Sequence, residues 1–546
     1  MEPVCPYNEK LMNKLLRRAN KKVGIKGAAL LLLVISLIGQ VLGFLRYKMV
    51  NANFDSMGAQ GTDAYFAAFK IPDFFFFTLA AGALGVAFMP FLADHLQKGD
   101  RKGVWDLSNS LMNLLTIVMA VVGVVMLVFA EPLIKYVVAP GLADPSTPPE
   151  QLHNAVMIMR IISFNPMLFA IAGVLASAQQ AFGRFFFFAM APVMYNASII
   201  ASVLLFKNNL GLVGLGVGAT LGAVLQLLVV ALGLVGADYQ WRPKIMWRSK
   251  DFKQILYQLP ARSLDQGVDS FNSIVETNLA TRLGQSSLTV YENAYILHTT
   301  PTQLVGTTIA TAAFPKLNER LSQGRPDLFR KDFLQILRAM IWIIMPIVVV
   351  CYFARAYFAR LIFTKNAPEI AVVFGFFAVA ILFRTIYSIV SRWFYSQKDT
   401  KTPLYVSLVA IALNIYLAYT LSRPTAYGLS GLAMAQSIVA TVEVCILVTI
   451  MLYRDPKLFD VNFWSGLVRI TSVTGFTILT AYIMIGLLPL NAGDRGFVTL
   501  GAKLGIVSLA TGLVHLAISL AFGLEEAKPV IEHIKRFILR PIKINY

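Results

Sequence analysis

The stretch AFMPFLADHLQKG at residues 87–99 returns later in the chain as AAFPKLNERLSQG at residues 312–324. Pro90 and Pro315 hold the same place in the two stretches, 225 positions apart (315 − 90). The leucines and the closing glycines keep the same separation. Recurrence at a fixed spacing is typical of a duplicated structural unit.

A second echo supports the duplication. The sequence GLVGL at 211–215 returns as GLSGL at 428–432, 217 positions later (428 − 211). Since both echoes join the first part of the chain to the second, we predict two equivalent lobes, at residues 25–240 and 250–455.

The composition predicts that both lobes lie in a membrane. Of the 546 residues, 57% are hydrophobic and 14% are charged, and the mean hydropathy is +0.65. These values lie outside the range of soluble domains and inside that of proteins with many transmembrane segments.

A helix that crosses about 30 Å of hydrocarbon needs about 20 mainly apolar residues. About 14 such runs occur, six in each lobe and two more within residues 462–523. They begin near residues 25, 63, 104, 152, 186, 211, 252, 287, 333, 367, 402, 428, 462 and 497. We therefore expect an all-α polytopic membrane protein with two six-helix lobes in parallel pseudo-repeat plus two C-terminal helices, because lipid forbids unpaired backbone.

The formal net charge of +19 is spread over many short loops instead of being gathered in one domain, which argues against a nucleic-acid partner. Lys and Arg are concentrated in the loops on the side of the N-terminus, so both termini are expected in the cytoplasm. Residues 1–24 would form a basic amphipathic or disordered tail, and residues 524–546 a second basic tail.

The seventh span carries the clearest polar pattern. Its polar side chains are spaced by 3, 4, 3 and 4 positions, which places them on one helical stripe: Arg262, Asp265, Asp269, Asn272 and Glu276. The stripe is either a cavity wall, whose carboxylates hold a cation or balance substrate charge, or an internally paired stripe that packs the lobes together.

Other ionisable residues lie in or near the spans. Arg46 ends the first span, while Asp63 and Lys70 open the second, so Arg46 and Asp63 could form an ion pair near the outer face or line a cavity. Arg384 begins a polar stripe in the tenth span, and Glu443 stands isolated in its own span.

The sequence contains no recognisable enzyme motif. The five histidines are scattered without an HExxH pair, the three cysteines are far apart, and no GxxxxGK[ST] loop occurs. We therefore expect neither an enzyme nor a nucleotide-driven pump, and no cofactor beyond a coupling ion such as Na⁺ or H⁺.

Several motifs together resemble one known family, over nearly the whole chain from about residue 25. They are VLGFLR at 41–46, TDAYFAAFKIPD at 62–73, AGALGVAFMPFLA at 81–93, TAAFPKLNERLSQG at 311–324 and FYSQKDTKTP at 394–403. The chain is similar to the MurJ (MviN) lipid II flippases of bacterial cell-wall synthesis, within the multidrug/oligosaccharidyl-lipid/polysaccharide exporter superfamily.

The resemblance implies that the chain moves undecaprenyl-linked peptidoglycan precursor from the cytoplasmic to the outer leaflet by alternating access. It implies a monomer in the bacterial cytoplasmic membrane, in contact with membrane lipids and with cell-wall synthesis proteins as potential partners. The two C-terminal helices would shape a groove for the lipid tail.

The resemblance also assigns residues. Arg46 closes the family's GFxR motif, and Asp63 matches the acid of its TDAF-like motif. Glu276 and Asn414 correspond to positions that hold a monovalent cation in sodium-binding members. Cations available for the substrate diphosphate are Arg46, Lys70, Arg262 and Arg384.

Departures from the family leave other functions open. Family arginines are replaced by Phe76 or Phe77, and an Asp-Arg pair is missing around Tyr295. The alternatives are a related exporter of another lipid-linked oligosaccharide or an amphipathic drug, and a non-transporting scaffold with the same fold.

Overall fold

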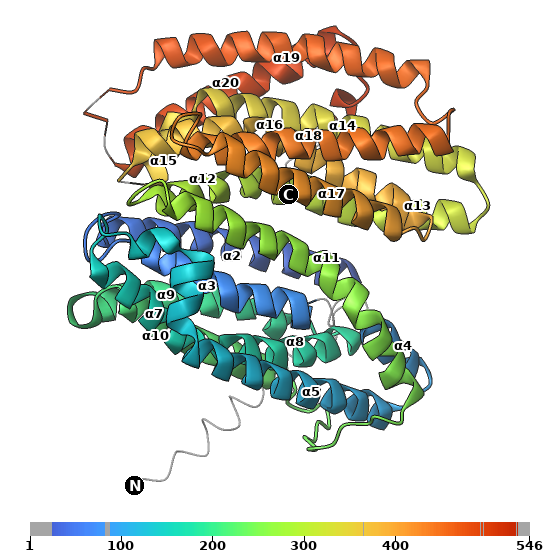
Figure 1. The fold of residues 1–546 in the computed structure, drawn as a ribbon. Coiled ribbons are helices and arrows are strands. Elements are labelled where there is room, and N and C mark those ends of the chain that lie inside the picture. The colour runs from blue at the N-terminus through green and yellow to red at the C-terminus, as the bar shows by residue number, and fades with distance from the viewer. Residues whose placement is uncertain are drawn as a thin grey trace, which may run out of the picture. The chain divides into compact units, whose positions relative to one another are not determined.

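The computed structural model describes residues 25–81, 88–363, 365–491, 493–494, 496–530 and 532. The predicted N-terminal tail and most of the C-terminal tail lie outside this part of the chain. The chain divides into two compact units, Met1–Thr289 and Val290–Tyr546 (Figure 1). Each unit is described by itself below.

The first unit is a bundle of α-helices with short π and 3₁₀ segments. In chain order they are α2 (Ile25–Asn53), α3 (Asp63–Phe75), η1 (Phe76–Ala81), α4 (Met89–Gln97), α5 (Arg101–Val128), α6 (Ala130–Pro132), η3 (Leu133–Val138), η4 (Pro140–Ala143), α7 (Pro149–Ile162), α8 (Asn165–Ala181), α9 (Phe186–Leu210), α10 (Val213–Leu232) and α11 (Lys250–Thr281). Helix α11 packs on α3 and η1 of this unit. Its polar stripe is therefore placed beside the second span.

The second unit begins within α12 (Ser287–Pro301). It continues with η5 (Thr302–Thr307), α13 (Thr308–Ser322), α14 (Pro326–Phe353), α15 (Arg355–Ile362), α16 (Ala367–Ser396), α17 (Lys401–Leu421), α18 (Leu429–Arg454), α19 (Val461–Leu487) and α20 (Phe497–Ala521). Helices α16, α17 and α18 pack on one another, while α19 and α20 form a pair that packs on α14. The C-terminal pair thus joins the second unit (Figure 1).

The described helices confirm a multi-pass membrane protein. Ten segments in the described part of the chain are long and apolar enough to span a bilayer. They are Arg101–Val128, Pro149–Ala181, Phe186–Leu210, Val213–Leu232, Pro326–Phe353, Ala367–Ser396, Lys401–Leu421, Leu429–Arg454, Val461–Leu487 and Phe497–Ala521. The four remaining predicted spans lie in α2, in α3 with η1, in α11 and in α12 with η5, which are not among these ten segments, so the count of 14 stays a prediction.

The duplication seen in the sequence has a structural counterpart. In the first unit α3 leads through the π-helix η1 into the region before α4, and in the second α12 leads through the π-helix η5 into α13. The first residues of η1 and η5 are 226 positions apart (302 − 76), and so are their last residues (307 − 81). π-helical turns are rare and often mark functional positions, so their recurrence at one offset supports two equivalent halves.

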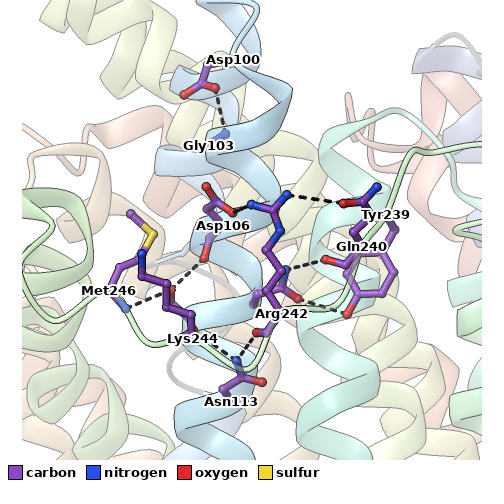
Figure 2. Close-up of polar contacts among 11 residues, drawn as sticks. Asp100, Gly103, Asp106, Asn113, Tyr239, Gln240, Arg242, Lys244 and Met246 are labelled. Atoms are coloured by element: carbon purple, nitrogen blue, oxygen red, sulfur yellow. Dashed lines mark hydrogen bonds and ion pairs between the residues drawn. The ribbon is translucent and has the colours of Figure 1, made fainter.

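The segment that connects α10 to α11 lies along α5 (Figure 2). The Asn109 side-chain amide donates to the Gln240 carbonyl at 2.8 Å, and that of Asn113 donates to the carbonyls of Arg242 and Lys244 at 2.7 and 3.1 Å. Because Asn109 and Asn113 are four residues apart, they share one face of α5. That face fixes the path of the connection between the predicted lobes.

Removing one of these amides should loosen the connection. Asn113→Ala deletes two side-chain to backbone bonds and the bond that Asn113 Oδ1 accepts from the Trp241 indole, all at an exposed site, which together stabilise by about 1 kcal/mol. We expect tryptic cleavage after Lys244 to become about fivefold faster. The control is Asn196→Ala, which removes an amide that bonds to the carbonyl of Pro192 in its own helix. Equal cleavage of Asn113→Ala and the wild type would refute the role of Asn113.

The motif FYSQKDTKTP forms the turn between α16 and α17. Asp399 accepts hydrogen bonds from the backbone amides of Lys401 and Thr402 at 3.1 and 3.0 Å and forms an ion pair with Arg454 at 2.6 Å. Burial disfavours its charge, but the bonds from Thr402 and Arg454 outweigh this effect and lower the pKa of Asp399 to about 2. Asp399 therefore fastens the start of α17 to the end of α18.

This pKa predicts how the stability depends on pH. Since the folded-state pKa lies below the usual 3.8, ionised Asp399 stabilises the fold above about pH 4, and the contribution is lost as the pH falls toward 2. Asp399→Asn should cost about 1 kcal/mol at pH 6, because the carboxylate is partly exposed. The difference in melting temperature between wild type and variant should shrink from pH 5 to pH 2; a constant difference would contradict the assignment.

Candidate functional site

Two residues of the predicted stripe on α11 are in contact. The Asn272 side-chain amide donates to Glu276 Oε1 at 3.0 Å, and both side chains are buried, Glu276 with 3% of its surface exposed. Asp269 is exposed. The side chains of Arg262 and Asp265 lie outside the described residues. The stripe thus combines a buried carboxylate with an exposed one a few turns away.

Lys70 of α3 reaches the same face of α11. Its ammonium group donates to Ser273 Oγ at 2.9 Å, and Ser273 lies between Asp269 and Glu276 along the helix. Near this contact Thr78 of η1 packs directly on Gly267, where an added Cβ atom would lie 2.5 Å from Thr78 Oγ1. Since glycine permits this approach, the sequence of α11 brings η1 and a cation against the polar stripe.

Asp63 is buried and bonds to the first turn of α12. Its Oδ1 atom accepts from the backbone amide of Thr289 at 2.7 Å and from the Thr289 hydroxyl at 2.5 Å. The hydroxyl of Thr62 lies 2.8 Å from the same hydroxyl. A carboxylate at a helix N-terminus satisfies amides that have no partner within the helix, so Asp63 fixes the start of α12.

Arg46 does not pair with Asp63 in the described part of the chain. Its guanidinium carbon lies 5.2 Å from the centre of the Tyr47 ring, a cation–π distance. In place of the ion pair considered from the sequence, Arg46 lies near the Tyr47 ring and the Asp63 carboxylate accepts the bonds from Thr289.

The second unit contains a polar network that the sequence did not reveal. Arg384 of α16 forms an ion pair with Glu443 of α18 at 2.9 Å and donates to Gln436 Oε1 at 3.3 Å. The other Glu443 oxygen accepts from the Ser407 hydroxyl of α17 at 2.8 Å. The prediction that Glu443 is isolated is wrong, because helix packing brings residues 59 positions apart into contact. The two partners lie on different helices, so helical spacing does not indicate the pair, whereas the balance of charges among the spans does.

Asn414 of α17 is buried, with 2% of its surface exposed. Glu276 and Asn414 belong to different units, so their proposed association stays a prediction. No group of three or more His, Cys, Asp or Glu side chains in the described residues is arranged for a metal ion.

Aromatic side chains stand where the family resemblance expects arginines, at Phe76 or Phe77, and beside the place where it expects an Asp-Arg pair, at Tyr295. Phe76 packs edge-on against Phe169, with 5.6 Å between ring centres, whereas Phe77 is 40% exposed. In the second unit Tyr295 is 37% exposed and its ring lies 5.0 Å from that of His298. Each unit therefore has one partly exposed aromatic ring, that of Phe77 or of Tyr295, at or beside these positions.

Comparisons with known proteins point to one family. A family model described as "Lipid II flippase MurJ" matches residues 56–502. A probable lipid II flippase MurJ of Borreliella burgdorferi is 23% identical over 441 residues, covering 79% of this chain and 84% of that protein. One of Rhizobium meliloti is 23% identical over 521 residues, covering 92% of this chain and 94% of that protein.

Solved structures share the fold. A lipid II flippase MurJ in an inward closed conformation matches with a TM-score of 0.73 at 20% identity, covering 90% of this chain and 98% of that one. An inward-facing MATE multidrug transporter of the MOP superfamily matches with a TM-score of 0.63 at 17% identity, covering 81% of this chain and 98% of that one.

Proposed function

Because the chain belongs to the lipid II flippase MurJ family, we propose that it moves lipid II from the cytoplasmic to the outer leaflet of the membrane by alternating access. The agreement of the chain with that family over most of its length carries this proposal. The polar stripe on α11 supports it, since ionisable groups at membrane depth usually face a cavity or a partner. Translocation makes and breaks no bond, so the protein acts as a transporter and not as an enzyme.

The diphosphate of this substrate would be held by cationic side chains, which bind phosphate oxygens strongly. We assign Arg46, Lys70 and Arg262 of the first unit and Arg384 of the second to this role. Asp265 and Asp269 would balance the positive charge when the substrate leaves. Asp63 contributes indirectly, by holding the start of α12 through Thr289.

The energy source is proposed to be an ion gradient. Glu276 offers a buried carboxylate and Asn414 an amide oxygen, both of which suit a hard monovalent cation such as Na⁺. The same carboxylate could take up H⁺ instead. Dependence of transport on Na⁺ or on pH distinguishes these two ions.

The location of the protein is inferred from its family and from the distribution of its basic residues. We place the protein in the bacterial cytoplasmic membrane as a monomer surrounded by lipids, with both termini in the cytoplasm, since Lys and Arg gather on that side. Cell-wall synthesis proteins are the expected partners, and nucleic acid is not.

A second candidate function rests on the exposed aromatic rings of Phe77 and Tyr295. With aromatic groups in place of family arginines, the cavity would suit a related lipid-linked oligosaccharide or an amphipathic drug. A scaffold without transport activity would tolerate the same replacements.

Complementation tests the proposed function. In a bacterium depleted of its own lipid II flippase, the wild-type chain should restore growth, and Arg262→Ala should abolish the rescue. Arg423→Ala is the control, because Arg423 lies in the turn after α17, over the ring of Tyr419. Correct membrane insertion without rescue by the wild type would reject lipid II as substrate; rescue of a strain lacking another oligosaccharide exporter would favour the second candidate.

A further inference from the structure

His95 lies between two carboxylates at the end of the first unit where α4, α5 and α11 meet. Its Nδ1 atom is 2.9 Å from Asp100 Oδ2, and its Nε2 atom is 3.1 Å from Asp251 Oδ2. Asp100 precedes the first residue of α5, and Asp251 lies in the first turn of α11. One imidazole therefore connects the α4–α5 corner to the start of the helix that carries Asn272 and Glu276.

The chemistry of this contact depends on a proton. Ionised carboxylates only accept hydrogen bonds, and a neutral imidazole has a single N–H group. Both His95 nitrogens can donate only when the ring is an imidazolium. Histidine ordinarily changes its charge between pH 5 and 8, so the doubly bonded arrangement belongs to the acidic end of this range.

The two carboxylates are not equivalent. Asp100 is held in place because its Oδ1 atom accepts from the Gly103 amide at 2.8 Å. This bond, followed by the one from His95, lowers the pKa of Asp100. A neutral His95 would keep its remaining proton toward the closer Asp100 and turn a lone pair toward Asp251. Deprotonation therefore breaks the contact with α11.

The surrounding charged groups come from every element of the corner. Asp94 and Lys98 of α4 pair with each other at 2.6 Å, and Arg101 of α5 pairs with Asp238 at 3.6 Å. Lys98 is also attracted to Asp251. The further cations are Lys102 of α5 and Lys250 of α11. Carboxylic acids and amines ordinarily titrate far from neutral pH, whereas an imidazole ordinarily changes its charge between pH 5 and 8.

The internal repeat supplies a comparison. The position equivalent to His95 in the second unit is Arg320, 225 residues later (320 − 95). Its guanidinium donates to Asp332 at 2.9 Å, and Asp332 also binds Lys316 at 3.0 Å. Arginine keeps its charge at all relevant pH values. One half of the protein thus has a permanent cation where the other has a titratable one.

We propose that His95 is a proton-operated clamp, which ties the first turn of α11 to the α4–α5 corner when it is protonated and releases that turn when it is neutral. The clamp makes the position of one end of α11 respond to the pH on its own side of the membrane. It rests on the contacts of His95 and is independent of the identity of the substrate.

Distances between spin labels test the clamp in the full-length protein in lipid nanodiscs. Labels are placed at Q97C on α4 and Q254C on α11, both exposed positions, after replacement of Cys5, Cys351 and Cys445. At pH 5.5 one short distance should dominate. At pH 8.5 a second, longer distance should grow, with the ratio of the two populations changing about three- to tenfold, as expected for exposed ion pairs.

Three variants separate the clamp from a general effect of pH. His95→Arg should keep the short distance at both pH values, as a permanent cation would. His95→Gln and Asp251→Asn should give distributions that do not change with pH. Equal wild-type distributions at pH 5.5 and 8.5, or an unchanged pH response in His95→Gln, would overturn the proposal. Because no substrate is present, failure here is distinct from failure of the proposed transport function.

Discussion

Glu443→Ala is expected to lower the free energy of unfolding by about 3 kcal/mol, the largest change in stability that we predict. The substitution removes the Glu443 carboxylate with which the Arg384 guanidinium, 27% exposed, forms an ion pair at 2.9 Å. Removing one member of a buried pair typically costs about 3–5 kcal/mol, and the partial exposure of Arg384 places the effect at the lower end. Thermal unfolding in detergent, followed by the loss of monodisperse protein, measures the change.

The double variant Arg384→Met, Glu443→Leu should recover most of this loss, because a hydrophobic pair can replace a buried ion pair at little cost. Asp94→Ala is the control, since its pair with Lys98 is exposed and should be worth less than about 1 kcal/mol. If the double variant is as unstable as Glu443→Ala, the loss does not come from the charge that Arg384 keeps in Glu443→Ala.

Glu276→Gln is expected to reduce transport about ten- to hundredfold, a large change in activity, while the protein stays folded. Glu276 is the buried carboxylate on the α11 stripe, and its Oε1 atom accepts from Asn272. Glutamine keeps the size of the side chain but removes the charge that a coupling cation needs. Transport by the variant in proteoliposomes should also lose its response to Na⁺, or to pH if H⁺ is the coupling ion.

Glu319→Gln provides the matched control, because Glu319 is exposed on α13 and bonds to Gln323 in its own helix. The control should transport at the wild-type rate with the wild-type ion dependence. Wild-type transport by Glu276→Gln, with unchanged ion dependence, would remove Glu276 from the coupling mechanism.

The fold could be predicted from the sequence because lipid imposes a simple rule on it. Expected spans that begin at residues 186, 367 and 497 coincide with the starts of α9, α16 and α20. The repeated motif around Pro90 and Pro315 is matched by two π-helices at nearly the same offset. Long apolar runs and internal repeats are local properties of a sequence, so they can be read without knowledge of packing.

The contacts between helices could not be predicted in the same way. Glu443 pairs with Arg384 on another helix, and Asp63 accepts a hydrogen bond from Thr289, which lies 226 positions away in the sequence. The amides of Asn109 and Asn113 donate to backbone carbonyls of a loop. Every residue has such a carbonyl, so the residue types of the loop do not indicate these bonds. Such contacts depend on how helices pack, and helical spacing reports only the face on which a residue lies.

Transport of lipid II by the purified protein tests the central claim most directly. The protein is reconstituted into liposomes that carry fluorescent lipid II, and a reagent that cannot cross the membrane quenches the headgroups on the outer surface. We predict that headgroups from the inner leaflet become accessible faster than in protein-free liposomes, and that Arg262→Ala abolishes this gain. Accessibility equal to that of protein-free liposomes, with correctly inserted wild-type protein and the ion gradient applied in either direction, would contradict the assignment of this chain as a lipid II flippase.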